Sequence, residues 1–162
     1  MTSNTLVAGI GNIFLSDDGF GPEVLRCFAP RVSDPAVRAT DYGIRGMHLA
    51  YDLLDGYDAL VLVDALPSQG APGTLHVFEV DHQHVSAASG LDAHAMDPAA
   101  VFASLNALGG APPYTVVVGC EVACVEDGIG LSDAVSAAVP GAVRAVQHVV
   151  AGLAARTAAR EG

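Results

Sequence analysis

The chain has 162 residues, of which 51% are hydrophobic, and it carries a formal net charge of -11. This length and composition are typical of a globular protein with a buried core, and we expect residues 1–162 to form a single domain. The excess of acids, 18 Asp and Glu against 7 Lys and Arg, disfavours binding to nucleic acid or anionic lipid. It favours a neutral, basic or metal-bearing partner.

No targeting segment is recognisable in the sequence. Residues 1–10 contain no basic stretch, and nowhere do about 18 apolar residues follow one another. We therefore expect a cytoplasmic protein without membrane insertion. The 3 cysteines are an odd number and show no metal-type pairing beyond one CxxxC, so we expect reduced thiols.

Apolar runs typical of strands alternate with segments of helical periodicity. Runs rich in Val, Leu and Ala predict strands over residues 5–8, 37–40, 59–63, 74–80 and 114–118. Helices are predicted in four places: from Pro22; over residues 47–54, with Met47, Ala50, Leu53 and Leu54 on the buried face; from Pro98 to Gly109; and from Ser132 to the end, broken near Pro140.

This alternation predicts an α/β fold, a three-layer sandwich of about five mostly parallel strands with helices on both faces. The strand at 74–80 is the candidate for an antiparallel edge, because only the short stretch PSQGAPG separates it from its predecessor.

The first strand leads into GIGNIFLSDDGFG, residues 9–21, where many α/β proteins bind a phosphate. The loop fails the dinucleotide fingerprint, because Phe14 stands where the third glycine belongs, and it lacks the lysine of a P-loop. Asp17 and Asp18 would also repel a pyrophosphate. Two interpretations remain: the acids solvate the turn and favour the following helix N-terminus, or they face a cation.

Further candidate ligands follow other strands. Asp64 ends the apolar run LVLVD at the same sheet edge, although a capping or turn aspartate is the alternative. His82, His84 and His94 lie between the fourth strand and the third helix, and a solvated surface turn is the alternative for them. His94, in DAHAMDP, directly precedes that helix. Two carboxylates and an imidazole from three loops would form a metal site with open positions.

The motifs GIGNIFLSDDGFG, LVLVDAL, DAHAMDP, VVVGCEV and GIGLSDAV, in this order, resemble the hydrogenase maturation protease family. The resemblance covers nearly the whole chain. It implies an α/β endopeptidase that removes a C-terminal extension from the large-subunit precursor of a nickel-iron hydrogenase after nickel insertion. Nickel would arrive in the precursor, and no organic cofactor is expected.

Carried over residue by residue, the resemblance implies that Asp18, Asp64 and His94 contact the metal and carry catalysis. The family commonly has a Gly-Thr-x-Gly type turn after the second strand, whereas this chain has Gly43-Ile44-Arg45-Gly46. We predict that Gly43, Arg45 and Gly46 contact the substrate, and a solvated loop charge is the alternative for Arg45.

Covalent catalysis is disfavoured, because no G-x-S-x-G elbow occurs and Cys120, at the end of an apolar strand, is interpreted as a packed core residue. Two other functions remain open. One is a non-catalytic nickel-sensing or chaperone module for the same precursor. The other is nucleotide binding, which the acidic loop opposes.

Overall fold

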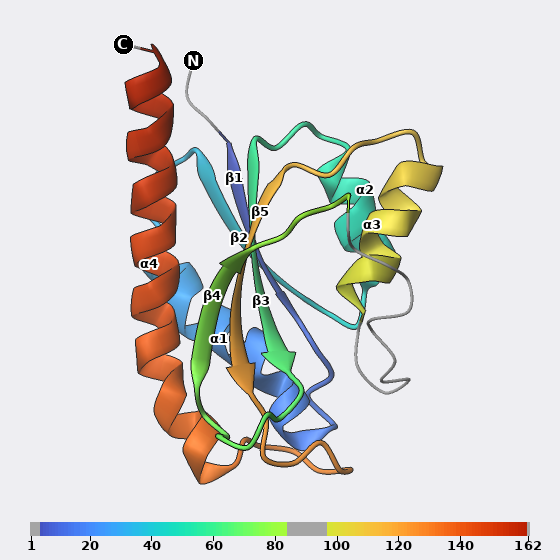
Figure 1. Cartoon of the computed structure of the whole chain (residues 1–162), viewed down its shortest axis with the longest axis vertical. Coiled ribbons are helices and arrows are strands. Elements are labelled where there is room, and N and C mark those ends of the chain that lie inside the picture. Colours follow the sequence, from blue (N-terminus) through green and yellow to red (C-terminus); the bar gives the residue numbers. More distant parts are fainter. Residues whose placement is uncertain (1–3, 84–96, 162) are drawn as a thin grey trace.

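The computed structural model describes residues 4–83 and 97–161, in which one five-stranded sheet lies between two layers of helices (Figure 1). The strands are β1 (Thr5–Ile10), β2 (Val37–Gly43), β3 (Ala59–Leu66), β4 (Leu75–Glu79) and β5 (Tyr114–Glu121). The helices are α1 (Phe20–Phe28), α2 (Gly46–Leu53), α3 (Pro98–Ala107) and α4 (Asp133–Glu161), with 3-10 turns η1 (Ser16–Gly19) and η2 (Ala29–Arg31).

The strand order is β2-β1-β3-β5-β4, and only the β4–β5 pair is antiparallel. This confirms the predicted fold class, including the antiparallel edge strand. The four parallel strands extend two or three residues beyond their predicted ends, to Ile10, Gly43, Leu66 and Glu121. Pairing with neighbouring strands, rather than local apolarity, sets these ends.

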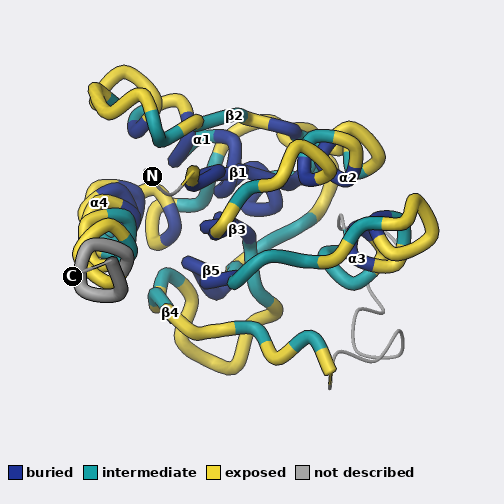
Figure 2. The backbone as a smooth tube through the Cα atoms, turned by 90° about the horizontal axis from the view of Figure 1, so that it is seen from above, coloured by how far each residue is buried: buried dark blue, intermediate teal, exposed yellow. Residues whose placement is uncertain are grey.

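The alternating side chains of the central strands divide the core in two. Leu60 and Leu62 of β3 pack with α2 and α3, whereas Val61 and Val63 pack with α1 and α4. Helices cover both faces of the sheet, which explains why the sequences of the central strands are continuous apolar runs. Figure 2 shows these strands buried, with the edge strands β2 and β4 more exposed.

Two helix predictions need correction. On α2 the buried side chains are Leu49, Ala50 and Leu53, whereas Met47 and Leu54 are exposed, because they lie at the margin of the face that packs on the sheet. The last helix is not broken at Pro140 but continues through it from Asp133. Pro140 lies on the exposed side, and the helix is held instead by its buried side chains Val135, Val139, Val143 and Val146.

From Asp133 to Arg156, α4 is long and apolar enough to cross a membrane by length and composition alone. Core helices can pass the same test, and α4 packs along α1 and one face of the sheet (Figure 1). We therefore describe α4 as a helix of the outer layer.

The carboxyl ends of β1, β2, β3 and β5 meet at one edge of the sheet, at the bottom of Figure 1. The chain leaves β1 for β2 on one side and later returns to β3 on the other. Because α/β proteins bind ligands where connections diverge in this way, the end of β1 and β3 is the place to look for a site.

Candidate functional site

The glycines of the first loop bring it close to the sheet. A Cβ on Gly11, which has φ +140°, would lie 1.9 Å from the Asp18 carbonyl oxygen. A Cβ on Gly21 would lie 2.3 Å from the carbonyl oxygen of Ile10 and 2.5 Å from that of Val63. Only glycine permits these contacts, which seat η1 and the start of α1 against the ends of β1 and β3.

Asp17 is a buried structural residue. Its carboxylate accepts hydrogen bonds from Ala123 N (2.8 Å), Cys124 N (3.0 Å), Ser132 N (2.7 Å) and Ser132 Oγ (2.9 Å). Burial opposes its ionisation, but the bonds from Ser132, Ala123 and Cys124 together outweigh burial and lower the pKa of Asp17. Asp17 therefore ties η1 to the loop between β5 and α4, and does not solvate the turn.

Asp18 and Asp64 are both buried at the switch point between β1 and β3. Asp18 Oδ2 accepts a hydrogen bond of 2.7 Å from Asn12 N. Asp64 lies near the end of β3, and the alternation of side chains places it on the side of Leu60 and Leu62, toward α2 and α3. Burial raises the pKa of Asp64 well above its ordinary value, and the charge of Asp18 raises it further. The two predicted acids are therefore close together.

Asp97 is a third acid near this site that our sequence reasoning missed. It is the N-cap of α3, where its Oδ1 accepts a hydrogen bond of 2.9 Å from Ala99 N. Its charge also contributes to the raised pKa of Asp64. The signal was present in the sequence, since Asp followed by Pro98 is typical of a helix start. The N-terminus of α3 is consequently near enough to Asp64 for the charge of Asp97 to act on it.

The predicted third ligand, His94, lies outside the described residues, as does His84. His48 lies beside Asp52, and His76 Nε2 lies 2.8 Å from Glu121 Oε2. His82 is not a surface side chain as expected, because its ring packs on Phe102 and its Nε2 lies 3.0 Å from Thr115 Oγ1. Within residues 4–83 and 97–161, no group of three or more His, Cys, Asp or Glu side chains is placed to hold a metal ion.

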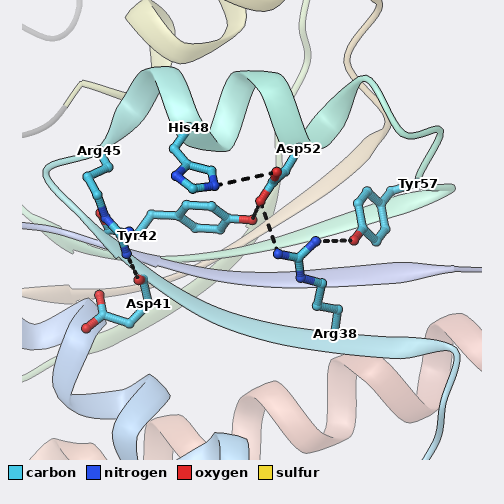
Figure 3. A network of polar contacts seen from close by, with 7 residues as sticks. All are labelled: Arg38, Asp41, Tyr42, Arg45, His48, Asp52 and Tyr57. Atoms are coloured by element: carbon cyan, nitrogen blue, oxygen red, sulfur yellow. Dashed lines mark hydrogen bonds and ion pairs between the residues drawn. The ribbon is translucent and has the colours of Figure 1, made fainter.

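The turn between β2 and α2 lies directly beside the first loop, since Gly11 N donates to Gly43 O at 2.9 Å. Arg45 is exposed, and its Nη2 donates to Asp41 O (2.8 Å) and its Nε to Tyr42 O (3.2 Å), so the guanidinium folds back on β2 (Figure 3). Gly46 begins α2.

Below this turn, a buried tyrosine holds α2 against β2 (Figure 3). Tyr42 OH donates to Asp52 Oδ2 at 2.6 Å, and Arg38 Nη2 lies 3.3 Å from the same oxygen. These contacts join β2 to α2, the two elements that the turn connects. Between the turn and the first loop lies an open hollow of about 250 Å³, lined by Gly11, Asn12, Ile13, Phe14, Asp41, Tyr42, Gly43, Ile44 and Arg45.

Comparison with known proteins identifies the family. The family model described as "Hydrogenase maturation protease" matches residues 22–149. The chain belongs to the hydrogenase maturation protease family. It is 30% identical over 143 residues to the Hydrogenase 2 maturation protease of Escherichia coli K12, covering 87% of each chain. It is also 30% identical over 149 residues to the hydrogenase expression/formation protein HupD of Rhizobium leguminosarum bv. viciae, covering 90% of this chain and 73% of HupD.

Solved structures agree with this assignment. The hydrogenase maturating endopeptidase HybD of Escherichia coli superposes with a TM-score of 0.77 and 27% identity, over 92% of this chain and 93% of HybD. A second Escherichia coli endopeptidase, solved in solution, gives a TM-score of 0.76 with 29% identity, over 88% and 89% of the two chains. The chain is therefore a peptidase, and the resemblance seen in its motifs is confirmed.

The structure also bears on the covalent alternative. Cys120 is fully buried on β5, as predicted, and packs in the core with α1 and α4. Burial, with the charges of Asp17 and Glu121, raises the pKa of its thiol to about 11. Such a thiol is neither ionised nor accessible near neutral pH, so Cys120 is unsuited to act as a nucleophile.

Proposed function

We propose that this peptidase removes a C-terminal extension from the large-subunit precursor of a nickel-iron hydrogenase in the cytoplasm, after nickel has been inserted. Nickel belongs to the substrate in this proposal, no organic cofactor takes part, and residues 1–162 act as a single domain. The observation that carries the proposal is the pair Asp18 and Asp64, two buried carboxylates at the switch point, where burial and then the charge of Asp18 raise the pKa of Asp64.

A cation brought by the substrate would relieve the repulsion between these two acids. The cationic side chain of the β2–α2 turn, Arg45, donates to the carbonyls of Asp41 and Tyr42. In the proposal, Asp18 and Asp64 provide oxygen ligands and His94 a nitrogen ligand, a donor set that suits a divalent transition metal. A metal bound there polarises a carbonyl and lowers the pKa of water from about 15.7 toward 7.

This arrangement makes cleavage conditional on nickel. A loaded precursor brings a cation to the acidic pair, so loaded precursor binds more tightly than unloaded precursor. A 100-fold preference requires only about 2.7 kcal/mol, which one partly desolvated metal contact can supply. Premature trimming of an empty precursor is thereby prevented.

The substrate tail is proposed to pass along the β2–α2 turn. Gly43 and Arg45 line the hollow beside the first loop, and Gly46 opens α2 next to it. With its guanidinium held on β2, Arg45 contributes the wall of the hollow and a fixed positive charge. In this position it is suited to face a carbonyl of the tail.

The test is a purified cleavage reaction. Nickel-loaded and nickel-free large-subunit precursor are incubated with the protease in chelator, and mass spectrometry measures the precursor C-terminus. We expect only the loaded precursor to be shortened. Equal rates for both forms would contradict the nickel dependence, and a precursor that binds but keeps its length would indicate a non-catalytic nickel-sensing or chaperone module.

Single substitutions test which residues cleavage requires. Asp18→Ala, Asp64→Ala and His94→Ala should each reduce processing by roughly 100-fold or more, with little further loss on combination, because the residues act as one unit. Asp55→Ala is the matched control, since Asp55 is exposed and lies just beyond the far end of α2. Full processing by the His94→Ala variant would remove His94 from the site.

A further inference from the structure

Four large apolar side chains project from the loops around the candidate site. We call them the apolar rim: Ile13 is 49% exposed, Phe14 60%, Ile44 68% and Ile129 79%. They belong to three loops that follow β1, β2 and β5 at the same sheet edge. Ile13, Phe14 and Ile44 line the hollow of about 250 Å³. Exposed apolar side chains that are grouped in this way mark an interaction surface.

Hydrogen bonds hold the loops that carry Phe14 and Ile129 in place, so the fold itself keeps these side chains exposed. Gly128 N donates to Phe14 O, and Ser16 N donates to Gly128 O, both at 2.9 Å. Ser16 also has an unusual φ of 50° for a residue with a side chain, and its Oγ donates to Glu126 O at 2.8 Å. Together with the buried Asp17 carboxylate, these bonds hold the Phe14 and Ile129 segments side by side. Such preorganisation reduces the entropy lost on binding.

The rim is continuous with the acidic centre. Phe14 is followed closely in the chain by Asp18, and Asn12, which also lines the hollow, donates its N–H to Asp18. Asp18 is therefore in direct contact with a residue that lines the hollow. The chain has a net charge of -11, so its acidic centre suits a cationic group on the partner. The four apolar side chains around that centre suit apolar groups on the same partner.

We propose that the apolar rim docks an apolar segment of the hydrogenase large-subunit precursor beside the scissile bond, with one large aliphatic or aromatic side chain seated in the hollow between Phe14 and Ile44. The inference rests on the proposed function and specifies how that substrate is held. Rim contacts form equally in the ground state and the transition state. Their loss raises KM and leaves kcat unchanged.

The experiment compares two phenylalanines. Phe14→Ser removes a rim residue, whereas Phe78→Ser, the matched control, removes a phenylalanine that is 45% exposed on the edge strand β4. Sedimentation velocity measures the affinity for nickel-free precursor, because this precursor is not cut and makes no metal contact. We expect roughly a tenfold weaker affinity for Phe14→Ser, as for a truncated anchor residue, and no change for Phe78→Ser.

Ile44→Ser is the second rim variant, on an independent loop, and thermal unfolding confirms that each variant is folded. With loaded precursor, both rim variants should raise KM by a similar factor at constant kcat. Unchanged affinity and KM in both would overturn the inference. An equal loss of affinity for Phe78→Ser would also overturn it. So would a dimer of the protease alone that dissociates in the Phe14→Ser variant, since a second copy of the chain would then cover the rim.

The two proposals fail separately. If the wild-type protein binds the precursor through the rim but does not shorten it, the cleavage proposal is wrong and the docking surface stands. If it shortens loaded precursor while the rim variants match the wild type, cleavage stands and the docking surface is wrong. If no precursor binds, both are wrong.

Discussion

At the scale of single residues, the adjacent acids Asp17 and Asp18 have different roles. Asp17 accepts four hydrogen bonds and is buried, so its charge is used to join η1 to the loop before α4. Asp18 is also buried, and its charge adds to the effect of burial in raising the pKa of Asp64. One acid therefore stabilises the loop, and the other provides the charge that we propose for cation recognition.

The substitutions Asp17→Asn and Asp18→Asn should separate these roles. An amide at position 17 places an N–H₂ group against backbone donors, so we expect the free energy of unfolding to fall by about 2–4 kcal/mol. At position 18, loss of a charge that repels Asp64 should leave stability within about 1 kcal/mol of the wild type while cleavage is lost. Urea unfolding and the precursor cleavage assay measure the two effects. An equal loss of stability in both variants would contradict this division.

At the scale of elements, Glu121 connects the antiparallel pair β4–β5 at the sheet edge to the loop between β3 and β4. Its Oε1 accepts hydrogen bonds from Gln69 N (2.7 Å) and Ala71 N (3.3 Å), and its Oε2 lies 2.8 Å from His76 Nε2. The hydrogen bond with His76, followed by that from Gln69, lowers the pKa of Glu121. The carboxylate thus joins β5, β4 and the β3–β4 loop.

This pairing predicts a pH-dependent contribution to stability. Because the pKa of Glu121 in the folded protein lies below its ordinary value of 4.5, its stabilising effect is present above pH 4.5. The effect is lost as the pH falls from 4.5 through the lower folded-state pKa. Urea unfolding of the wild type and Glu121→Gln should therefore differ at pH 7 and converge under acid conditions. A difference that stays constant with pH would exclude ionisation of Glu121 as its source.

At the scale of the whole molecule, the ends of the described chain lie away from the candidate site. β1 begins and α4 ends at the top of Figure 1, whereas the carboxyl ends of the parallel strands lie at the bottom. By the rise of an α-helix, the 29 residues of α4 span about 43 Å, which carries its end away from that edge.

A folded tag after residue 162 should therefore keep kcat/KM for loaded precursor within about twofold of the untagged value. The same tag inserted after Gly70, in the exposed β3–β4 loop at the site edge, should obstruct the precursor and lower kcat/KM. Steady-state cleavage measures both. A C-terminal tag that blocks cleavage would show that the precursor also contacts α4.

Much of this organisation was predictable from local patterns. The five strands, the start of α1 and the antiparallel edge follow from apolar periodicity, from proline positions and from the length of PSQGAPG. The first acidic loop and Asp64 could be selected because both lie at the carboxyl end of a strand at the same edge, and the family resemblance selected Asp18 over Asp17. The break at Pro140 was wrong, and the solvated turn weighed for His82 does not hold, because both depend on contacts with distant segments.

The sequence by itself determined the order of elements, the family and the acidic character of the first loop, because these depend on residues close together in the chain. Only the tertiary structure decided which of two neighbouring aspartates is a structural clamp, since Asp17 bonds to Ser132, 115 residues away. It likewise decided that Asp97 lies near Asp64 and that the apolar rim gathers beside them. Such assignments depend on the packing of loops from separate strands, and no local pattern specifies how close those loops lie.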